Sequence, residues 1–303
     1  GLVLLFAAAH LSPAHAQVSA GLAWLESRQA ANGVHRDSDL AAAVDANAEA
    51  WITAQVVSEA GRFASLGSIV RTARDDSLMS VARLAYIRLE QGESAQTQIT
   101  EMLALQQADG GFPPRAGHQS EVLTTAWMLV ALERAGQGAG TPAARAVGYL
   151  IGNQGTDGGW IAASGNPASV FATAIAAHAL VSYRNRYELT QTLSRATGFL
   201  LGRRGADNLI GADFETALAL DALLALRADR AQLNPVATAL AARQQANGSF
   251  AGDAYITALA LRALWRHALP PVAPSDAGLT GRVLAADTEL PITGAVLTLT
   301  GAT

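Results

Sequence analysis

Apolar residues recur with helical spacing through most of this chain, in six segments that share one pattern. Each segment can be aligned on a reference position, and the residue seven positions later is apolar in every segment. Positions 0, +4 and +7 lie on one face of an α-helix, so each segment is expected to form a helix that buries this face. The six reference residues are Glu49, Ser80, Thr125, Thr173, Thr216 and Thr257.

A second repeated pattern, Gln-x-x-(Asp/Asn)-Gly, precedes these helices. It occurs at 29–33, 106–110, 154–158 and 244–248, with a degenerate copy at 204–208. Leu or Met stands seven residues before each Asp or Asn anchor, so an outer helix is expected to run into each glycine and end there. The long gap between the first two copies predicts a further degenerate copy near Asp75. The copies from 106 onward are 40 to 50 residues apart. Repeats of this length indicate six helical hairpins of about 43 residues each.

Three strings resemble a known repeat. They are Gln106 to Phe112 (QQADGGF), Gln154 to Trp160 (QGTDGGW) and Gln244 to Phe250 (QQANGSF), each followed by a Thr-Ala helix start. They are similar to the prenyltransferase and squalene-cyclase repeat of α/α toroid proteins, over roughly residues 18–268. The resemblance implies an all-α toroid in which six inner helices close into a barrel and six outer helices surround it. Such toroids serve enzymes and non-enzymatic binders alike.

The two ends of the chain follow other patterns. Residues 1–16 form an apolar run that ends in Ala14-His15-Ala16, a small-x-small triplet typical of signal peptidase sites, so they are expected to be the remnant of a signal peptide. The alternative is an amphipathic first helix of the domain. With a signal peptide at 1–16, the toroid spans 17–268, and export to the periplasm or the medium is expected.

The C-terminal end predicts a linker and a second domain. Residues 269–278 are rich in proline, and alternating apolar positions follow on both sides of a turn at 291–294. The run 281–301 resembles the opening of carboxypeptidase regulatory-like β-sandwich domains. Two strands cannot bury a core alone, so 279–303 is expected to be a truncated fragment of such a domain.

Composition narrows the chemistry. Charged residues make up 15% of the 303 residues, against about 25% in an average soluble domain, and the formal charge is −4. No basic surface is available for nucleic acid. The sequence contains no Lys, which excludes Schiff-base chemistry and pyridoxal phosphate, and no Cys, which excludes thiol nucleophiles and thiolate zinc sites. No cofactor and no metal are expected, and no apolar run is long enough for membrane insertion.

The resemblance also allows individual activities to be tested. Class II terpene cyclases resemble this fold and protonate an alkene with an acid of an Asp-x-Asp-Asp motif, but the nearest string here is 37–40 (DSDL), which lacks the final acid. Those cyclases use aromatic faces and are expected to need two toroids, whereas aromatics are 6% here and one toroid is present. Related prenyltransferases and complement-like toroids need Cys, which is absent. A glycan lyase or hydrolase needs only two carboxylates and stays open.

Acidic residues recur four positions before the reference residue. These positions hold Asp45, Asp76, Glu121, Ser169, Ala212 and Asp253. A carboxylate here would cap a helix N-terminus, a role that typically contributes about 0.5–2 kcal/mol. Alternatively, because all inner helices start at the same end of the barrel, Asp45, Glu121 and Asp253 would surround its mouth and bind a ligand.

Polar residues also appear five positions after the reference residue, on the side of the inner helices away from the packing face. This column reads Ala54, Ala85, Val130, His178, Asp221 and Arg262. One interpretation is a structural ion pair of Asp221 with Arg262 beside His178. The other is a ligand site inside the ring. Trp51 and Trp127, two past the reference column, also lean toward this side, although filling the core is an alternative role for both.

The sequence therefore favours an exported, non-catalytic toroid module. It would bind or present a small molecule, glycan or protein as part of a larger multidomain extracellular protein. A glycan lyase or hydrolase and a degenerate terpene-cyclase-like enzyme are the rival hypotheses.

Overall fold

The computed structural model of this protein describes residues 13–30, 43–67, 77–162 and 165–270. The chain divides into two compact units, Gly1–Leu269 and Pro270–Thr303, and the described helices belong to the first. The predicted repeat copy near Asp75, most of the linker and the β-sandwich fragment at 279–303 lie outside the described residues. They stay predictions.

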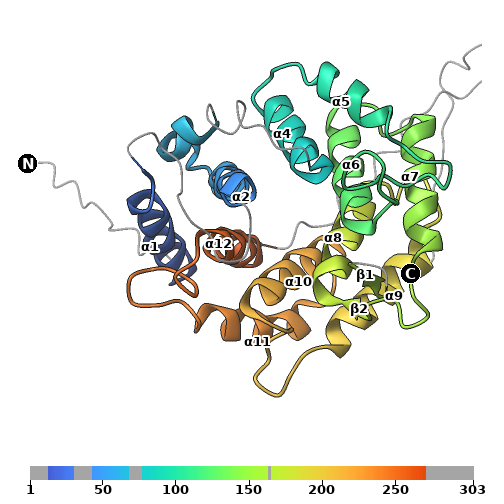
Figure 1. Cartoon of the computed structure of the whole chain (residues 1–303). Helices are drawn as coiled ribbons and strands as arrows, with labels where there is room; N and C mark the ends of the chain where they lie inside the picture. Colours follow the sequence, from blue (N-terminus) through green and yellow to red (C-terminus); the bar gives the residue numbers. More distant parts are fainter. Residues whose placement is uncertain (1–12, 31–42, 68–76, 163–164, 271–303) are drawn as a thin grey trace, which may run out of the picture. The chain divides into compact units, whose positions relative to one another are not determined.

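Six helices form a closed inner ring, which confirms the predicted α/α toroid (Figure 1). Each inner helix contacts the next one along the chain, and the last, α12, packs against the first, α2. The ring consists of α2 (Ala43–Val56), α4 (Leu78–Glu90), α6 (Val122–Arg134), α8 (Val170–Val181), α10 (Asp213–Ala225) and α12 (Ala254–Ala268). The packing face is apolar as expected, since Leu132, Leu180 and Leu223 are fully buried.

The outer helices lie against this ring. They are α1 (Pro13–Ser27), α5 (Gln96–Leu103), α7 (Thr141–Gly152), α9 (Thr190–Gly202) and α11 (Arg230–Ala241). Helix α5 packs on α4 and α6, α7 on α6, α9 on α8 and α10, and α11 on α10 and α12. In the second hairpin, the described part of the outer layer includes the 3₁₀ helix η1 (Ala60–Phe63), which packs on α2.

The repeated loops are fastened by the residue types that define the pattern. In the third hairpin, the Gln106 side chain donates hydrogen bonds to the carbonyl oxygens of Gly110 and Pro142, and so joins the loop to α7. The hydroxyl of Thr125 accepts a hydrogen bond from the backbone N–H of Phe112. Equivalent threonine bonds recur at Thr173, Thr216 and Thr257. The reference threonines therefore hold each loop against its inner helix.

Short β-contacts follow from the same loops. The strands β1 (Trp160–Ile161) and β2 (Ala168–Ser169) form an antiparallel pair, with Trp160 opposite Ser169. In the third hairpin, a single bridge joins Phe112 with Glu121, the residues that correspond to Trp160 and Ser169. In the last two hairpins, single bridges join Arg204 with Ile210 and Gln244 with Phe250, within the loop itself. The loop thus brings the chain back to the start of the next inner helix.

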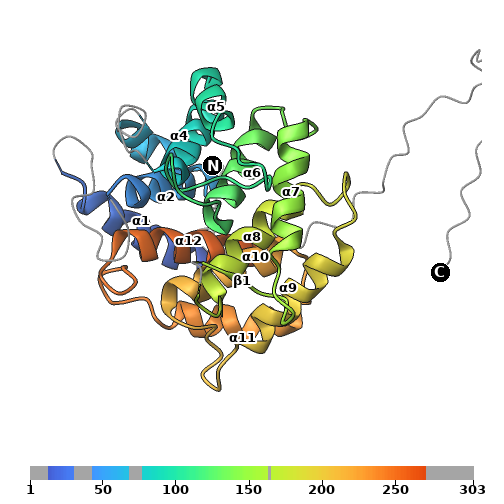
Figure 2. The ribbon, with the colours of Figure 1, turned by 45° about the vertical axis from the view of Figure 1, so that its right-hand side comes forward.

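The last loop closes the outer layer onto the first helix. Gln244 donates to the carbonyl oxygen of Gln17, 227 residues away, and the Gln17 side chain donates to Ala241. Both views place α1 beside α12 (Figures 1 and 2), and the two helices are in contact. The predicted cleavage triplet at 14–16 lies within the first residues of α1. Cleavage after Ala16 would leave the bonds between Gln17 and the last hairpin in place.

Gly248 sits where this closure is tightest. Its φ is +93°, and a Cβ there would lie 2.4 Å from the Ala20 carbonyl oxygen of α1. We expect Gly248→Ala to lower the free energy of unfolding by more than Gly252→Ala, whose φ of +69° is similar but whose Cβ would meet open space. The control measures the left-handed backbone cost of about 1–2 kcal/mol, and the clash adds about 1–3 kcal/mol. Urea unfolding of both variants measures the difference, and equal losses would contradict the tight contact.

Candidate functional site

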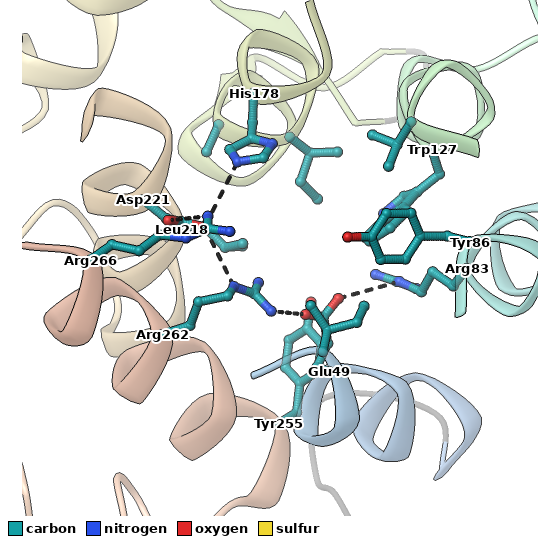
Figure 3. Close-up of a pocket in the computed structure, with 14 residues that line it drawn as sticks. Glu49, Arg83, Tyr86, Trp127, His178, Leu218, Asp221, Tyr255, Arg262 and Arg266 are labelled. Carbon is teal, nitrogen blue, oxygen red and sulfur yellow. Dashed lines mark hydrogen bonds and ion pairs between the residues drawn. The ribbon is translucent and has the colours of Figure 1, made fainter. Parts of the chain in front are cut away.

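A cavity of about 100 Å³ lies inside the inner ring (Figure 3). Every inner helix contributes to its wall. One residue of each helix, taken in order around the ring, gives Ile52, Tyr86, Val130, His178, Asp221 and Arg262. The remaining wall includes Trp127, Ile175 and Leu218, so apolar and charged groups share one space.

A chain of buried ion pairs runs along the wall formed by α2, α4 and α12. Arg83 on α4 lies 2.6 Å from the Oδ1 of Asp45 and 3.4 Å from the Oε1 of Glu49. The other Glu49 oxygen accepts a hydrogen bond of 2.6 Å from Arg262 on α12. Arg83, Glu49 and Arg262 are all buried. Glu49 thus connects two arginines across the junction between the first and last inner helices.

Asp221 on α10 continues this chain. Its Oδ2 lies 3.4 Å from the Nε of Arg262, and the Nη1 of Arg266 donates to both carboxylate oxygens at 2.7 and 2.8 Å. Burial alone would raise the pKa of Asp221, but the charges of Arg266 and Arg262, together with the nearby imidazole of His178, lower it to about 2. The carboxylate is therefore ionised throughout the physiological range.

His178 on α8 faces Asp221 without bonding to it. The Nε2 of His178 lies 3.9 Å from the Oδ2 of Asp221, beyond hydrogen-bond distance. Its side chain is 41% accessible and lies on the wall of the cavity. Burial lowers the pKa of His178, the positive charges of Arg266 and Arg262 lower it further, and Asp221 opposes them. The imidazole is neutral at pH 7 and available to a ligand.

Aromatic groups form the opposite side of the cavity. Figure 3 shows Tyr86 directing its hydroxyl toward the interior, with Trp127 beside it. The Arg83 guanidinium stacks 4.4 Å from the centre of the Trp127 ring, a cation–π contact. The Nε1 of Trp127 is buried and has no hydrogen-bond partner among the described residues. Burial is the main reason that the pKa of Tyr86 rises to about 12, so its hydroxyl stays protonated.

The structure brings together four of the residues selected from the sequence. His178, Asp221, Arg262 and Trp127 all line the cavity. Asp45 joins the ion-pair chain through Arg83. Whether these residues bind a ligand stays a prediction.

The other three selected residues lie away from the cavity. Asp253 caps α12 by accepting a bond from the N–H of Ile256, and Glu121 stands at the N-cap of α6 and accepts from Thr124. Trp51 is 2% exposed and packs in the core. None of the three is part of the cavity wall.

Sequence reasoning missed Glu49, Arg83 and Tyr86 because the reference positions in the first two inner helices were shifted. If Asn47 and Val81 replace Glu49 and Ser80 as references, the residues five positions later are Ile52 and Tyr86. Both line the cavity. The expected luminal residues Ala54 and Ala85 are instead fully buried in the core. The missing signal was an arginine, Arg83, within an otherwise apolar helical segment.

Comparisons with known proteins support the fold alone. No protein-family model matches the chain, and no curated protein matches it either. Solved structures do match. A protein from Actinoplanes has a TM-score of 0.69 at 17% identity, over 84% of this chain and 100% of that one. A variant of the type II terpene cyclase MstE from Scytonema, in complex with geranylgeranyl dihydroxybenzoate, has a TM-score of 0.67 at 15% identity. The match covers 85% of this chain and 98% of that one.

A third neighbour belongs to another enzyme class. A possible member of the GH105 family from Salmonella enterica has a TM-score of 0.60 at 12% identity, over 84% of this chain and 93% of that one. The MstE match also corrects an expectation. This chain has one toroid and covers 98% of that cyclase, so the expectation that such cyclases need two toroids is wrong.

Two features are absent from the described part of the chain. No group of three or more His, Asp or Glu residues there is arranged to hold a metal ion. None of the described helices combines the length and the hydrophobicity needed to span a bilayer.

The Asp221 ion pairs predict a specific pH dependence of stability. Because the folded-state pKa of Asp221 is about 2 against its usual 3.8, its contribution is complete above about pH 5 and is lost as the pH falls toward 2. We expect Asp221→Asn to lower the free energy of unfolding at pH 7 by about 3 kcal/mol, because Arg266 loses its carboxylate partner and Arg262 keeps only Glu49. The difference in free energy of unfolding between Asp221→Asn and the unmodified protein should narrow between pH 5 and pH 3.

Urea unfolding at several pH values measures this gap. The matched control is Glu133→Gln, which removes a pair with Arg186 at 2.6 Å on the surface, where such pairs contribute less than about 1 kcal/mol. A loss for Asp221→Asn no larger than for Glu133→Gln, or a gap constant down to pH 3, would contradict the assignment.

Proposed function

We propose that this chain is a non-catalytic binding module that holds a small ligand in the cavity of its inner ring. The observation that carries the proposal is the pairing of the luminal carboxylates with arginines. Asp45 and Glu49 are bonded to Arg83 and Arg262, and Asp221 is ionised between Arg262 and Arg266. Protonation of an alkene or a glycosidic oxygen needs a carboxylic acid that carries a proton.

The cavity itself supports binding. It combines apolar wall residues with a few polar groups that face inward, the usual arrangement of small-molecule sites. Ile52, Val130 and Leu218 supply apolar surface, while His178 and Tyr86 supply polar atoms. The ion pairs around them fix the side chains of the wall, so little ordering is required when a ligand enters.

Catalysis is the rival function, because the fold neighbours include a terpene cyclase and a possible GH105 protein. A neutral His178 is the one group in the cavity suited to proton abstraction. Neither Asp221 nor Glu49 is free to act as its acid partner.

Binding without turnover is the expected result of a direct test. The protein is screened by thermal shift against a fragment library, and at least one compound should raise the melting temperature. Ala174→Leu, which extends a side chain into the cavity, should abolish the shift. The control, Ala231→Leu, makes the same change at an exposed position on α11 and should retain it. Circular dichroism checks that both variants keep their helices.

The same protein is incubated with geranylgeranyl dihydroxybenzoate and with oligosaccharides. Mass spectrometry should recover each compound unchanged. Turnover that disappears in His178→Ala while the compound still binds would refute the non-catalytic proposal and establish the enzyme.

We also propose that the module is exported as part of a multidomain extracellular protein. The pattern of residues 1–16 supports this, and the fold is compatible with cleavage because Gln17 makes the hydrogen bonds between α1 and the last hairpin. The ring contact of His15 with Trp265, at 4.7 Å, would be lost. N-terminal sequencing of protein recovered from the periplasm or medium should therefore start near Gln17. Recovery of residues 1–16 in that material would refute the signal-peptide assignment.

A further inference from the structure

The charges around the cavity balance. In the described residues of the wall and its ion-pair chain, three carboxylates face three guanidinium groups. They are Asp45, Glu49 and Asp221 against Arg83, Arg262 and Arg266. His178 is neutral, and Tyr86 and Tyr255 keep their protons because burial raises their pKa values. The site therefore presents no net charge to a ligand.

A charged ligand would have to break this balance. An anion would compete with Asp221 for Arg266, whose Nη1 already contacts both carboxylate oxygens. A cation would compete with Arg83 and Arg262 for Glu49, which is 1% exposed. In either case one buried ion would be left without its partner, which is costly in a site of low dielectric. An uncharged ligand leaves all six ions paired.

A polar group on the wall remains for such a ligand. Neither ring nitrogen of His178 makes a hydrogen bond within the described part of the chain, and its side chain points into the cavity (Figure 3). A neutral imidazole offers one donor and one acceptor. An oxygen atom on the ligand would satisfy it.

We propose that the cavity takes an uncharged, compact molecule with an apolar ring or branched chain and one hydroxyl or carbonyl oxygen, bonded to His178. The inference rests on the proposed binding function and names the ligand class for that site. An apolar cavity of roughly 150 Å³ holds benzene. The volume of about 100 Å³ here accommodates a five-membered ring, with Ile52, Val130 and Leu218 in contact with its carbon atoms.

Three probes that share one ring but differ in charge test this inference. They are cyclopentanol, cyclopentanecarboxylate and cyclopentylamine, titrated at pH 7.5 by ligand-observed NMR. Cyclopentanol should bind at least about tenfold more tightly than the anion and the cation, because only the charged probes disturb the ion pairs. Loss of its signal in Ala174→Leu would place the probe in the cavity.

His178→Ala tests the hydrogen bond. Affinity for cyclopentanol should fall about five- to tenfold, the usual value of one hydrogen bond to a neutral group. His267→Ala is the matched control, since His267 bonds Asn234 at the end of α12 and is absent from the cavity wall. It should leave the affinity unchanged.

The outcomes separate the inference from the proposed function. Tighter binding of the carboxylate or the amine than of the alcohol overturns the neutral ligand class but leaves a binding site. The same holds if no cyclopentyl probe binds while another compound raises the melting temperature in an Ala174-dependent way. If no compound does so, the binding function fails as well. If His178→Ala and His267→Ala lose equal affinity for cyclopentanol, the role given to His178 is overturned.

Discussion

The ion pair between Glu49 and Arg262 joins the first inner helix to the last, and the site depends on it. These residues are 213 positions apart, and both are buried. A buried charge is tolerated only when it is paired, so the carboxylates and guanidiniums of neighbouring helices must meet when the ring closes. Closure of the barrel and construction of the cavity wall are therefore the same event (Figure 3). Arg83 and Asp221 extend the chain on either side.

The outer layer closes by different means. In the described loops, the side chains of Gln106, Gln154 and Gln244 donate to backbone carbonyl oxygens, and the reference threonines accept from backbone N–H groups. The last loop fastens to α1 through Gln244 and Gln17. These contacts need no charge and use the same residue types in successive hairpins. Because the loops maintain the fold, the luminal face of the inner helices is free to differ from hairpin to hairpin. That difference gives a neutral site with a polar side at His178 and an aromatic side at Trp127.

The comparisons show a likeness of fold and do not describe the luminal face. The Scytonema cyclase and the possible GH105 protein share the toroid with this chain at 15% and 12% identity. The same arrangement of helices thus accompanies proteins of two different classes, and what occupies the lumen must be argued from its side chains. Here the buried acids are bonded to arginines, and on this arrangement rests the proposal that the cavity holds a ligand without transferring a proton to it.

Helix spacing and the loop pattern determined the six inner helices and the luminal positions of His178, Asp221 and Arg262. The sequence alone sufficed there because Thr173, Thr216 and Thr257 each follow a recognisable loop and fix the register. In the first two inner helices Asn47 and Val81 occupy that position, so the expected references were wrong by two residues and by one residue. Each residue of error rotates a helix by about 100°. Glu49, Arg83 and Tyr86 were therefore missed. Only the tertiary structure decided which charges are partners, because ring closure pairs residues that no local periodicity connects.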